Sequence, residues 1–230
     1  MRYSRIIFLF LALALCLCAC QNARAAEQSE QIDFMEQVSF LGDSITAHLP
    51  LRSSIPQSRV WVTKERYLNL DSRITYAKIV APDTGEEERI ADVAARLRPA
   101  YLVVTLGIDY GVYYYRNDTD TFAHYYEKLI RAIQEASPDT VLLPQSILPV
   151  STACTVVSNE MIDRANERIR EIAERLGLFY LDTQSVLRDE KGFLREEFCN
   201  SEDGIHLSDK AYTVMLGFIR ERAVEMGWQA

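Results

Sequence analysis

Apolar and polar positions alternate along the chain in a way that predicts alternating strands and helices. Short apolar runs, several of them rich in Val, Leu and Ile, predict buried strands at 38–41, 59–62, 101–106, 140–143 and 178–181. Longer stretches of helical character predict helices at 87–97, 119–136, 159–176 and 208–226. Ser158 or Asn159 can cap the third helix and Gly177 can close it. This alternation indicates an α/β fold with a parallel sheet covered by helices on both faces.

The first 19 residues are typical of an export signal. Two arginines precede a nearly unbroken apolar run at 6–18, which is shorter than the about 20 residues that a membrane-spanning helix needs. Residues 17–20 resemble a bacterial lipoprotein box, in which Cys20 would carry the lipid. Cleavage after Ala25 is the alternative and would release the protein without a lipid. We therefore expect an extracytoplasmic protein, anchored to a membrane through Cys20 or, alternatively, secreted.

The remainder of the chain predicts a short linker and one domain. Residues 20–35 are polar and without a clear pattern, whereas 36–230 have the length of a single domain with a sizeable core. Acidic residues exceed basic ones by 33 to 25, which gives a formal net charge of −8. Nucleic-acid binding depends on basic patches, so we expect no nucleic acid partner. No cluster of His, Cys, Asp or Glu has metal-ligand spacing, and we expect neither a metal nor a cofactor.

Gly42, Asp43 and Ser44 form a candidate nucleophile motif. They follow the first predicted strand and precede a stretch that can turn helical. Such a turn places Ser44 at the carboxyl end of a strand, where open α/β sheets bind their ligands. The backbone N–H of Ser44 can then face a developing oxyanion. The same three residue types also favour simple tight turns, so this motif alone leaves both interpretations open.

A second motif near the C-terminus supplies an acid and a base. Asp203 precedes His206 by three residues, so one ring nitrogen can face the carboxylate while the other accepts a proton from a serine. Ser208 is a good N-cap for the last helix and would fix the loop that carries the histidine. A surface histidine beside an acid is the alternative. His48 could compete as the base of Ser44, but it has no acid partner at a recognisable spacing and is expected at the rim.

The two motifs together resemble those of the GDSL/SGNH hydrolase superfamily. Its nucleophile block is matched by Gly42–Ile45, and its acid-and-base block is matched by Asp203–Ser208. The resemblance covers most of the chain after about residue 36. It implies a hydrolase of esters with a three-layer α/β/α fold, in which five parallel strands follow a flavodoxin-like order.

The resemblance also implies an oxyanion hole, and one of its positions departs from the family pattern. Ser44 and Gly85 match the positions that contribute backbone N–H groups, although Gly85 could equally be a turn glycine. Asp109 stands where the family has an asparagine. An ionised carboxylate only accepts hydrogen bonds, and loss of one oxyanion donor typically costs about 3–4 kcal/mol. Asp109 could be protonated, the two N–H groups could suffice, or the chain could be a weak or lost enzyme.

Residues near the carboxyl edge of the predicted sheet are candidates for substrate binding. Tyr110 and Tyr113 belong to a tyrosine-rich segment directly after Asp109. Such rings suit stacking on sugars or lining an acyl pocket, or they could simply cover the sheet edge. Gln145 follows the fourth predicted strand and ends at the same edge.

Cys154 and Cys199 are the two cysteines that lie beyond the predicted signal and the lipid-anchor position. Outside the cytoplasm such a pair is a candidate disulfide, and here it would brace the loop that carries Asp203 and His206. Two thiols that never meet are the alternative.

These features predict an exported serine esterase. Ser44, His206 and Asp203 would cleave an ester of a small molecule, glycan or lipid through an acyl-enzyme, with short acyl groups such as acetyl first. The alternative is a protein that kept the hydrolase fold but lost efficient turnover, and that binds a glycan or a partner through its tyrosines.

Overall fold

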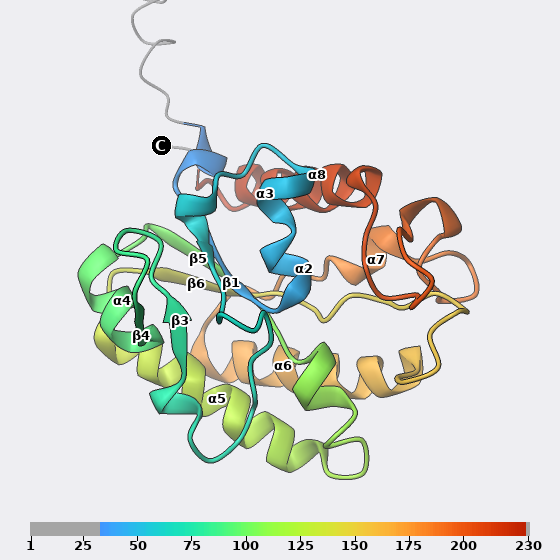
Figure 1. The fold of residues 1–230 in the computed structure, drawn as a ribbon, viewed down its shortest axis with the longest axis horizontal. Helices are drawn as coiled ribbons and strands as arrows, with labels where there is room; N and C mark the ends of the chain where they lie inside the picture. The colour runs from blue at the N-terminus through green and yellow to red at the C-terminus, as the bar shows by residue number, and fades with distance from the viewer. Residues whose placement is uncertain (1–32, 229–230) are drawn as a thin grey trace, which may run out of the picture.

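The computed structural model describes residues 33–228 (Figure 1). The predicted export signal, Cys20 and nearly all of the predicted linker lie outside these residues. Among the described residues, no helix is long and apolar enough to cross a membrane.

The central sheet has four parallel strands in the order β2-β1-β5-β6. These strands are β1 (Val38–Gly42), β2 (Val60–Trp61), β5 (Tyr101–Thr105) and β6 (Val141–Pro144). The chain moves outward from β1 to β2 and then crosses back to β5 on the other side of β1. This confirms the predicted α/β class and the flavodoxin-like order, which creates a crevice at the carboxyl ends of β1 and β5.

The predicted fifth strand is reduced to a single bridge. Leu181 pairs with Gln145, and its N–H donates to the carbonyl of Pro144 at 2.8 Å. The N–H of Leu178 is not available for pairing with a neighbouring strand. It donates instead to the Ala173 carbonyl at the end of the preceding helix, at 2.8 Å. The segment therefore reaches the sheet edge only at its last residue, which corrects the prediction of five strands.

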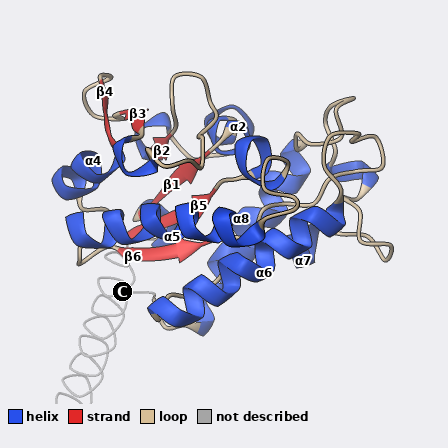
Figure 2. Cartoon of the chain, turned by 90° about the horizontal axis from the view of Figure 1, so that it is seen from below, coloured by secondary structure: helices blue, strands red, loops and turns tan. Residues whose placement is uncertain are grey.

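Two layers of helices cover the sheet, as Figures 1 and 2 show. One face carries α4 (Ile90–Leu97), α5 (Thr119–Ala136) and α6 (Asn159–Leu176), and the other carries α8 (Asp209–Glu225) with the short α2 (Ser44–Ala47), α3 (Leu49–Arg52) and α7 (Gln184–Leu187). Successive strand residues face opposite layers, so Leu102 and Val104 pack in one core cluster and Val103 in the other.

Local sequence signals account for several helix ends. The Ser158 hydroxyl accepts a hydrogen bond from Met161 N–H at the start of α6, and Gly177 closes that helix in a left-handed conformation with φ +66°. Ser208 caps α8 in the same way. The predicted helix at 87–97 begins only at Ile90, because its first three residues form a strand.

That strand belongs to an antiparallel hairpin that the sequence pattern did not predict. It consists of β3 (Lys78–Val80) and β4 (Glu87–Arg89). The remaining short elements are η1 (Phe34–Glu36), η2 (Gln57–Arg59), η3 (Ile74–Tyr76), a π-helical turn η4 (Ile108–Val112) and η5 (Glu196–Phe198).

Candidate active site

Ser44, His206 and Asp203 lie in one continuous chain of hydrogen-bonding atoms. Ser44 is the first residue of α2 and is separated from β1 by Asp43 alone; its Oγ is 3.0 Å from Nε2 of His206. The other ring nitrogen of His206, Nδ1, is 2.7 Å from Oδ2 of Asp203. The structure thus brings together two motifs that are 162 residues apart in the sequence.

Packing of α8 against the start of the domain explains this meeting. The hydroxyl of Tyr212, which is fully buried on α8, donates to the carbonyl of Ile45 on α2 at 2.7 Å. Arg52 of α3 also forms an ion pair of 2.9 Å with Asp209 at the start of α8. These two contacts therefore hold α8, which follows His206, against α2 and α3, which contain and follow Ser44.

The Asp203 carboxylate is held by its own loop. Its Oδ1 accepts hydrogen bonds from the N–H groups of Ile205, at 2.7 Å, and His206, at 3.2 Å, and from the hydroxyl of Ser201. Burial pushes the pKa of Asp203 upward, but these hydrogen bonds and the one to the His206 ring stabilise the charged form more strongly. The pKa of Asp203 therefore lies well below its ordinary value, which keeps the carboxylate charged beside the imidazole. Sequence reasoning missed Ser201, although a hydroxyl two residues before the acid was visible.

Gly204 lets this loop approach its neighbour closely. Its φ is +74°, and a Cβ at this position would lie 2.5 Å from the backbone nitrogen of Cys154. The N–H of Ser151 donates to the Gly204 carbonyl at 2.8 Å. The acid-and-base loop is thus braced by backbone contact with the segment around residue 151.

Asp43 organises the turn that carries Ser44. Its side chain is buried, with 2% of the residue exposed. Oδ1 accepts from Leu68 N–H at 3.0 Å, and Oδ2 accepts from Gly107 N–H at 2.9 Å. The carboxylate therefore ties together the segments that follow β1, β2 and β5. Sequence reasoning placed Asp43 in the nucleophile motif, with a simple turn as the alternative. Its partners could not be read from the sequence because they are 25 and 64 residues away.

His48 lies beside His206 rather than in its place. The two ring centroids are 5.1 Å apart, and no side-chain hydrogen bond of the described residues joins His48 to Ser44. Burial lowers the pKa of His48, and the positive charges of His206, Arg52 and Arg66 lower it further, against the opposing effect of Asp203. The ring of His48 beside the candidate base is thus harder to protonate than a free imidazole.

Gly85 does not join this group. It lies in the turn of the β3–β4 hairpin with φ +76°, and its N–H donates to the Ala81 carbonyl at 2.8 Å. That N–H is already engaged, so the predicted role in an oxyanion hole is corrected to that of a turn glycine.

Asp109 lies on η4, and its side chain lies outside the described part of the structure, so its role stays a prediction. The N–H of Ser44 opens α2, where it has no carbonyl partner within the helix.

The predicted substrate-binding residues occupy different environments. Tyr110 on η4 packs its ring against Tyr67 at a centroid distance of 4.5 Å. Tyr113 is exposed, with the Arg116 guanidinium 4.4 Å from its ring centre. Gln145 is only 1% exposed, and its Oε1 accepts from the Thr105 hydroxyl at 2.9 Å. It is therefore a buried residue of the sheet edge, which corrects the prediction that it contacts substrate.

Both cysteines are free thiols in this structure, so the predicted disulfide is absent. Cys154 packs against the core cluster beneath α4, α5 and α6, whereas Cys199 packs against the cluster beneath α8. The Cys199 thiol instead donates to the Ser201 carbonyl at 3.3 Å. Among residues 33–228, no group of His, Cys, Asp and Glu side chains is arranged to hold a metal ion.

The fold and the site define an α/β protein with a Ser-His-Asp arrangement at the carboxyl edge of a parallel sheet. A family model for the GDSL-like lipase/acylhydrolase family matches residues 40–214. The chain therefore belongs to this family, whose members are esterases and acylhydrolases. Among curated proteins, none matches the chain.

Solved structures share the fold at low sequence identity. A candidate platelet activating factor from Streptococcus pneumonia has a TM-score of 0.58 and 20% identity, with 91% of this chain and 98% of that chain covered. A candidate acylhydrolase from Bacteroides fragilis has a TM-score of 0.53 and 16% identity, with 88% and 94% covered. A family two carbohydrate esterase from Clostridium thermocellum, solved as an active-site mutant with celluohexase, has a TM-score of 0.54 and 13% identity, with 84% and 64% covered.

Proposed function

We propose that this chain is an exported serine esterase in which Ser44 is the nucleophile, His206 the general base and Asp203 the residue that orients the imidazole. The observation that supports this most is the unbroken sequence of contacts from Asp203 Oδ2 through the His206 ring to Ser44 Oγ. Membership of the GDSL-like lipase/acylhydrolase family supports ester hydrolysis as the reaction.

The reaction follows from the roles of these groups. Ser44 Oγ attacks the ester carbonyl carbon while Nε2 of His206 takes the hydroxyl proton. The tetrahedral intermediate collapses as His206 returns this proton to the leaving alcohol, which leaves an acyl group on Ser44. Water then attacks the acyl-enzyme with His206 again acting as base. The charge of Asp203 stabilises the imidazolium that forms in both halves of the reaction.

The oxyanion would be held by the Ser44 N–H, which lies at the first position of α2. Gly85 is not included, because its N–H donates to Ala81. A protonated Asp109 would add a second donor, whereas an ionised one would weaken the site.

Export and substrate are further parts of this proposal. The N-terminal pattern supports an extracytoplasmic enzyme with a lipid on Cys20, or a secreted one if cleavage follows Ala25. Esters of glycans or lipids with short acyl groups are the proposed substrates. The fold shared with a carbohydrate esterase is a reason to test glycan esters early.

Hydrolysis of p-nitrophenyl acetate by residues 27–230 tests the proposal. We expect Ser44→Ala to reduce kcat by about a thousandfold or more, because the nucleophile is lost. Ser185→Ala, an exposed serine on α7, is the matched control and should retain full activity. Equal turnover by the wild type and Ser44→Ala would refute the proposed nucleophile.

The alternative, a fold that binds a glycan without efficient turnover, rests on Asp109. Asp109→Asn restores an amide donor at the family position, so it should raise activity if the carboxylate impairs the oxyanion hole. Absence of serine-dependent turnover in the wild type and in Asp109→Asn, with glycan affinity intact in Ser44→Ala, would favour the binding protein.

A further inference from the structure

The space around the candidate nucleophile is unequally divided between apolar and polar regions. The apolar cavity that borders the nucleophile turn has a volume of only about 10 Å³. A single water needs roughly 10–15 Å³ measured in this way, so this cavity is too small for an acyl chain. It is lined by Asp43, Ile45, Thr105, Leu106, Ile108, Ile147 and Leu148.

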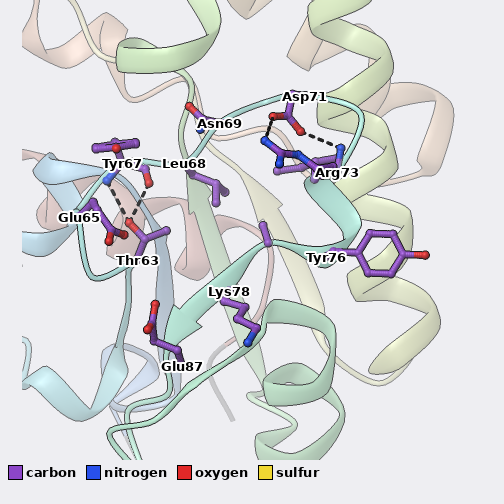
Figure 3. A pocket seen from close by; sticks show the side chains of 12 residues that line it. Thr63, Glu65, Tyr67, Leu68, Asn69, Asp71, Arg73, Tyr76, Lys78 and Glu87 are labelled. Carbon is purple, nitrogen blue, oxygen red and sulfur yellow. Dashed lines mark hydrogen bonds and ion pairs between the residues drawn. The ribbon is translucent and has the colours of Figure 1, made fainter.

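A much larger cleft lies along the segment that follows β2 (Figure 3). Its volume is about 390 Å³. Its charged lining includes the acids Glu65 and Glu87 and the base Lys78, and Asp71 and Arg73 form an ion pair of 3.3 Å in its wall. Both acidic and basic side chains therefore line this first cleft.

A second cleft of about 300 Å³ borders the same segment. Asn69 and Asp71 line both clefts, and the remaining walls of the second one include Tyr110 and Tyr114. Asn69 is exposed, so its amide is available to a ligand in either cleft. The two clefts thus adjoin across residues 69–71.

Three tyrosines form a row of rings along these clefts. The Tyr67 and Tyr110 ring centroids are 4.5 Å apart, and Tyr110 stacks on Tyr114 at 5.6 Å with an interplanar angle of 17°. Tyr67 lines the first cleft, whereas Tyr110 and Tyr114 line the second. Tyr114 is 62% exposed, so a large part of its surface is open to a ligand.

One hydrogen bond links the wall of the first cleft to the nucleophile turn. Leu68, which lines the first cleft, donates its N–H to Oδ1 of Asp43 at 3.0 Å. Asp43 immediately precedes Ser44. The wall of the first cleft is therefore in direct contact with the residue that precedes the candidate nucleophile.

We propose that the two adjoining clefts bind the alcohol side of the ester, and that this alcohol is a neutral oligosaccharide carrying a short acyl group such as acetyl. This inference rests on the proposed function. Amide, carboxylate and ammonium groups hydrogen-bond sugar hydroxyls, and tyrosine faces pack on the apolar faces of sugar rings. The acids Glu65, Asp71 and Glu87 are nearly balanced by Arg73 and Lys78, which suits a neutral ligand. A long acyl chain would find no room in the apolar cavity beside the nucleophile turn.

The first test compares O-acetylated cellohexaose, xylohexaose and chitohexaose with p-nitrophenyl acetate. We expect Asn69→Ala and Tyr114→Ala each to lower the ratio of kcat/KM for the preferred oligosaccharide to that for p-nitrophenyl acetate by about tenfold. Tyr114→Phe keeps the ring and should keep most of the ratio. Asn117→Ala, an exposed asparagine that lines neither cleft, is the matched control and should not change it.

Two outcomes separate this inference from the proposed function. Ser44-dependent hydrolysis of p-nitrophenyl acetate, with a ratio that neither Asn69→Ala nor Tyr114→Ala changes for any of the three sugars, would overturn the inference and leave the esterase standing. If no ester is hydrolysed in a Ser44-dependent way, calorimetry with unmodified cellohexaose, xylohexaose and chitohexaose still tests the clefts. Affinity for one of them that falls in Asn69→Ala and Tyr114→Ala would support the inference, and affinity for none of them would overturn it.

Discussion

Two aspartates lie next to the Ser44–His206 pair, and they differ in burial and in the reach of their hydrogen bonds. Asp43 is 2% exposed and binds backbone N–H groups that are 25 and 64 residues away. The Asp203 side chain is 42% exposed and is bound by groups within three residues of it.

This difference separates two ways of building a site. The Asp203 loop is a local unit, whose short spacing in the sequence is enough to place a carboxylate against an imidazole. The Asp43 turn is a tertiary unit, because its carboxylate finds its hydrogen-bond donors only when the segments after β1, β2 and β5 are packed together. We therefore expect substitution of Asp203 to affect catalysis without unfolding the protein, and substitution of Asp43 to affect both.

The largest expected effect is that of Asp203→Asn on catalysis. The amide has the shape of the carboxylate but cannot stabilise the imidazolium, and in serine triads this change typically lowers kcat by about 10⁴-fold. We expect a loss of 10³- to 10⁴-fold in p-nitrophenyl acetate hydrolysis. The free energy of unfolding should change by less than about 1 kcal/mol, because the carboxylate is partly exposed and screened. Glu202→Gln, the adjacent exposed acid, is the control and should keep full activity.

The pH dependence of the wild type sharpens the same point. Since the pKa of Asp203 is held below its ordinary value near 3.9, its carboxylate stays ionised throughout the range above about pH 4 and is protonated only on further acidification. Measured with p-nitrophenyl acetate from pH 8 to pH 4, kcat/KM should therefore show no loss that comes from protonation of Asp203. A carboxyl signal of Asp203 that titrates above pH 4 in NMR spectra of the 13C-labelled protein would contradict this expectation.

Asp43→Asn should have the next largest effect, mainly on stability. The substituted amide accepts at one atom and presents N–H donors at the other, so one of the Leu68 and Gly107 N–H groups loses its partner in a buried place. We expect a loss of about 2–4 kcal/mol in the free energy of unfolding in urea, together with reduced activity. Asp139→Asn, an exposed acid, should stay within about 0.5 kcal/mol of the wild type. Equal effects of the two substitutions would contradict the proposed tertiary role of Asp43.

Tyr212→Phe should have the smallest effect of the three substitutions. It removes one buried hydrogen bond between α8 and the Ile45 carbonyl while the ring remains packed. We expect a loss of about 1 kcal/mol in urea unfolding. Activity should fall only a few fold, since Arg52 and Asp209 still join α3 to α8. A neutral result, equal to that of the exposed control Tyr76→Phe, would show that the hydroxyl does not help to hold the histidine loop in register with Ser44.

Much of the fold could be predicted from the sequence, because its signals act over short distances. Apolar runs and helical stretches indicated the parallel α/β architecture, and Ser158 and Gly177 marked the ends of α6 at the residues where the structure has them. The two motifs also indicated which residues to look for at the sheet edge, since Ser44 follows a strand and Asp203 precedes His206 by three residues. Strand pairing was less predictable. The Leu178 N–H donates to a carbonyl at the end of α6, and in the predicted fifth strand only Leu181 pairs with the sheet.

Only the tertiary structure decided which partners these residues meet. A sequence does not state whether the N–H of Gly85 faces an oxyanion or the Ala81 carbonyl, whether Gln145 ends in solvent or beneath the sheet edge, or whether Cys154 and Cys199 share one side of the core. The sequence by itself determined local geometry, because turns, caps and short spacings depend on a few neighbouring dihedral angles. The Asp43 contacts and the placement of His206 beside Ser44 depend on packing of the whole core, which joins residues that no short-range pattern connects.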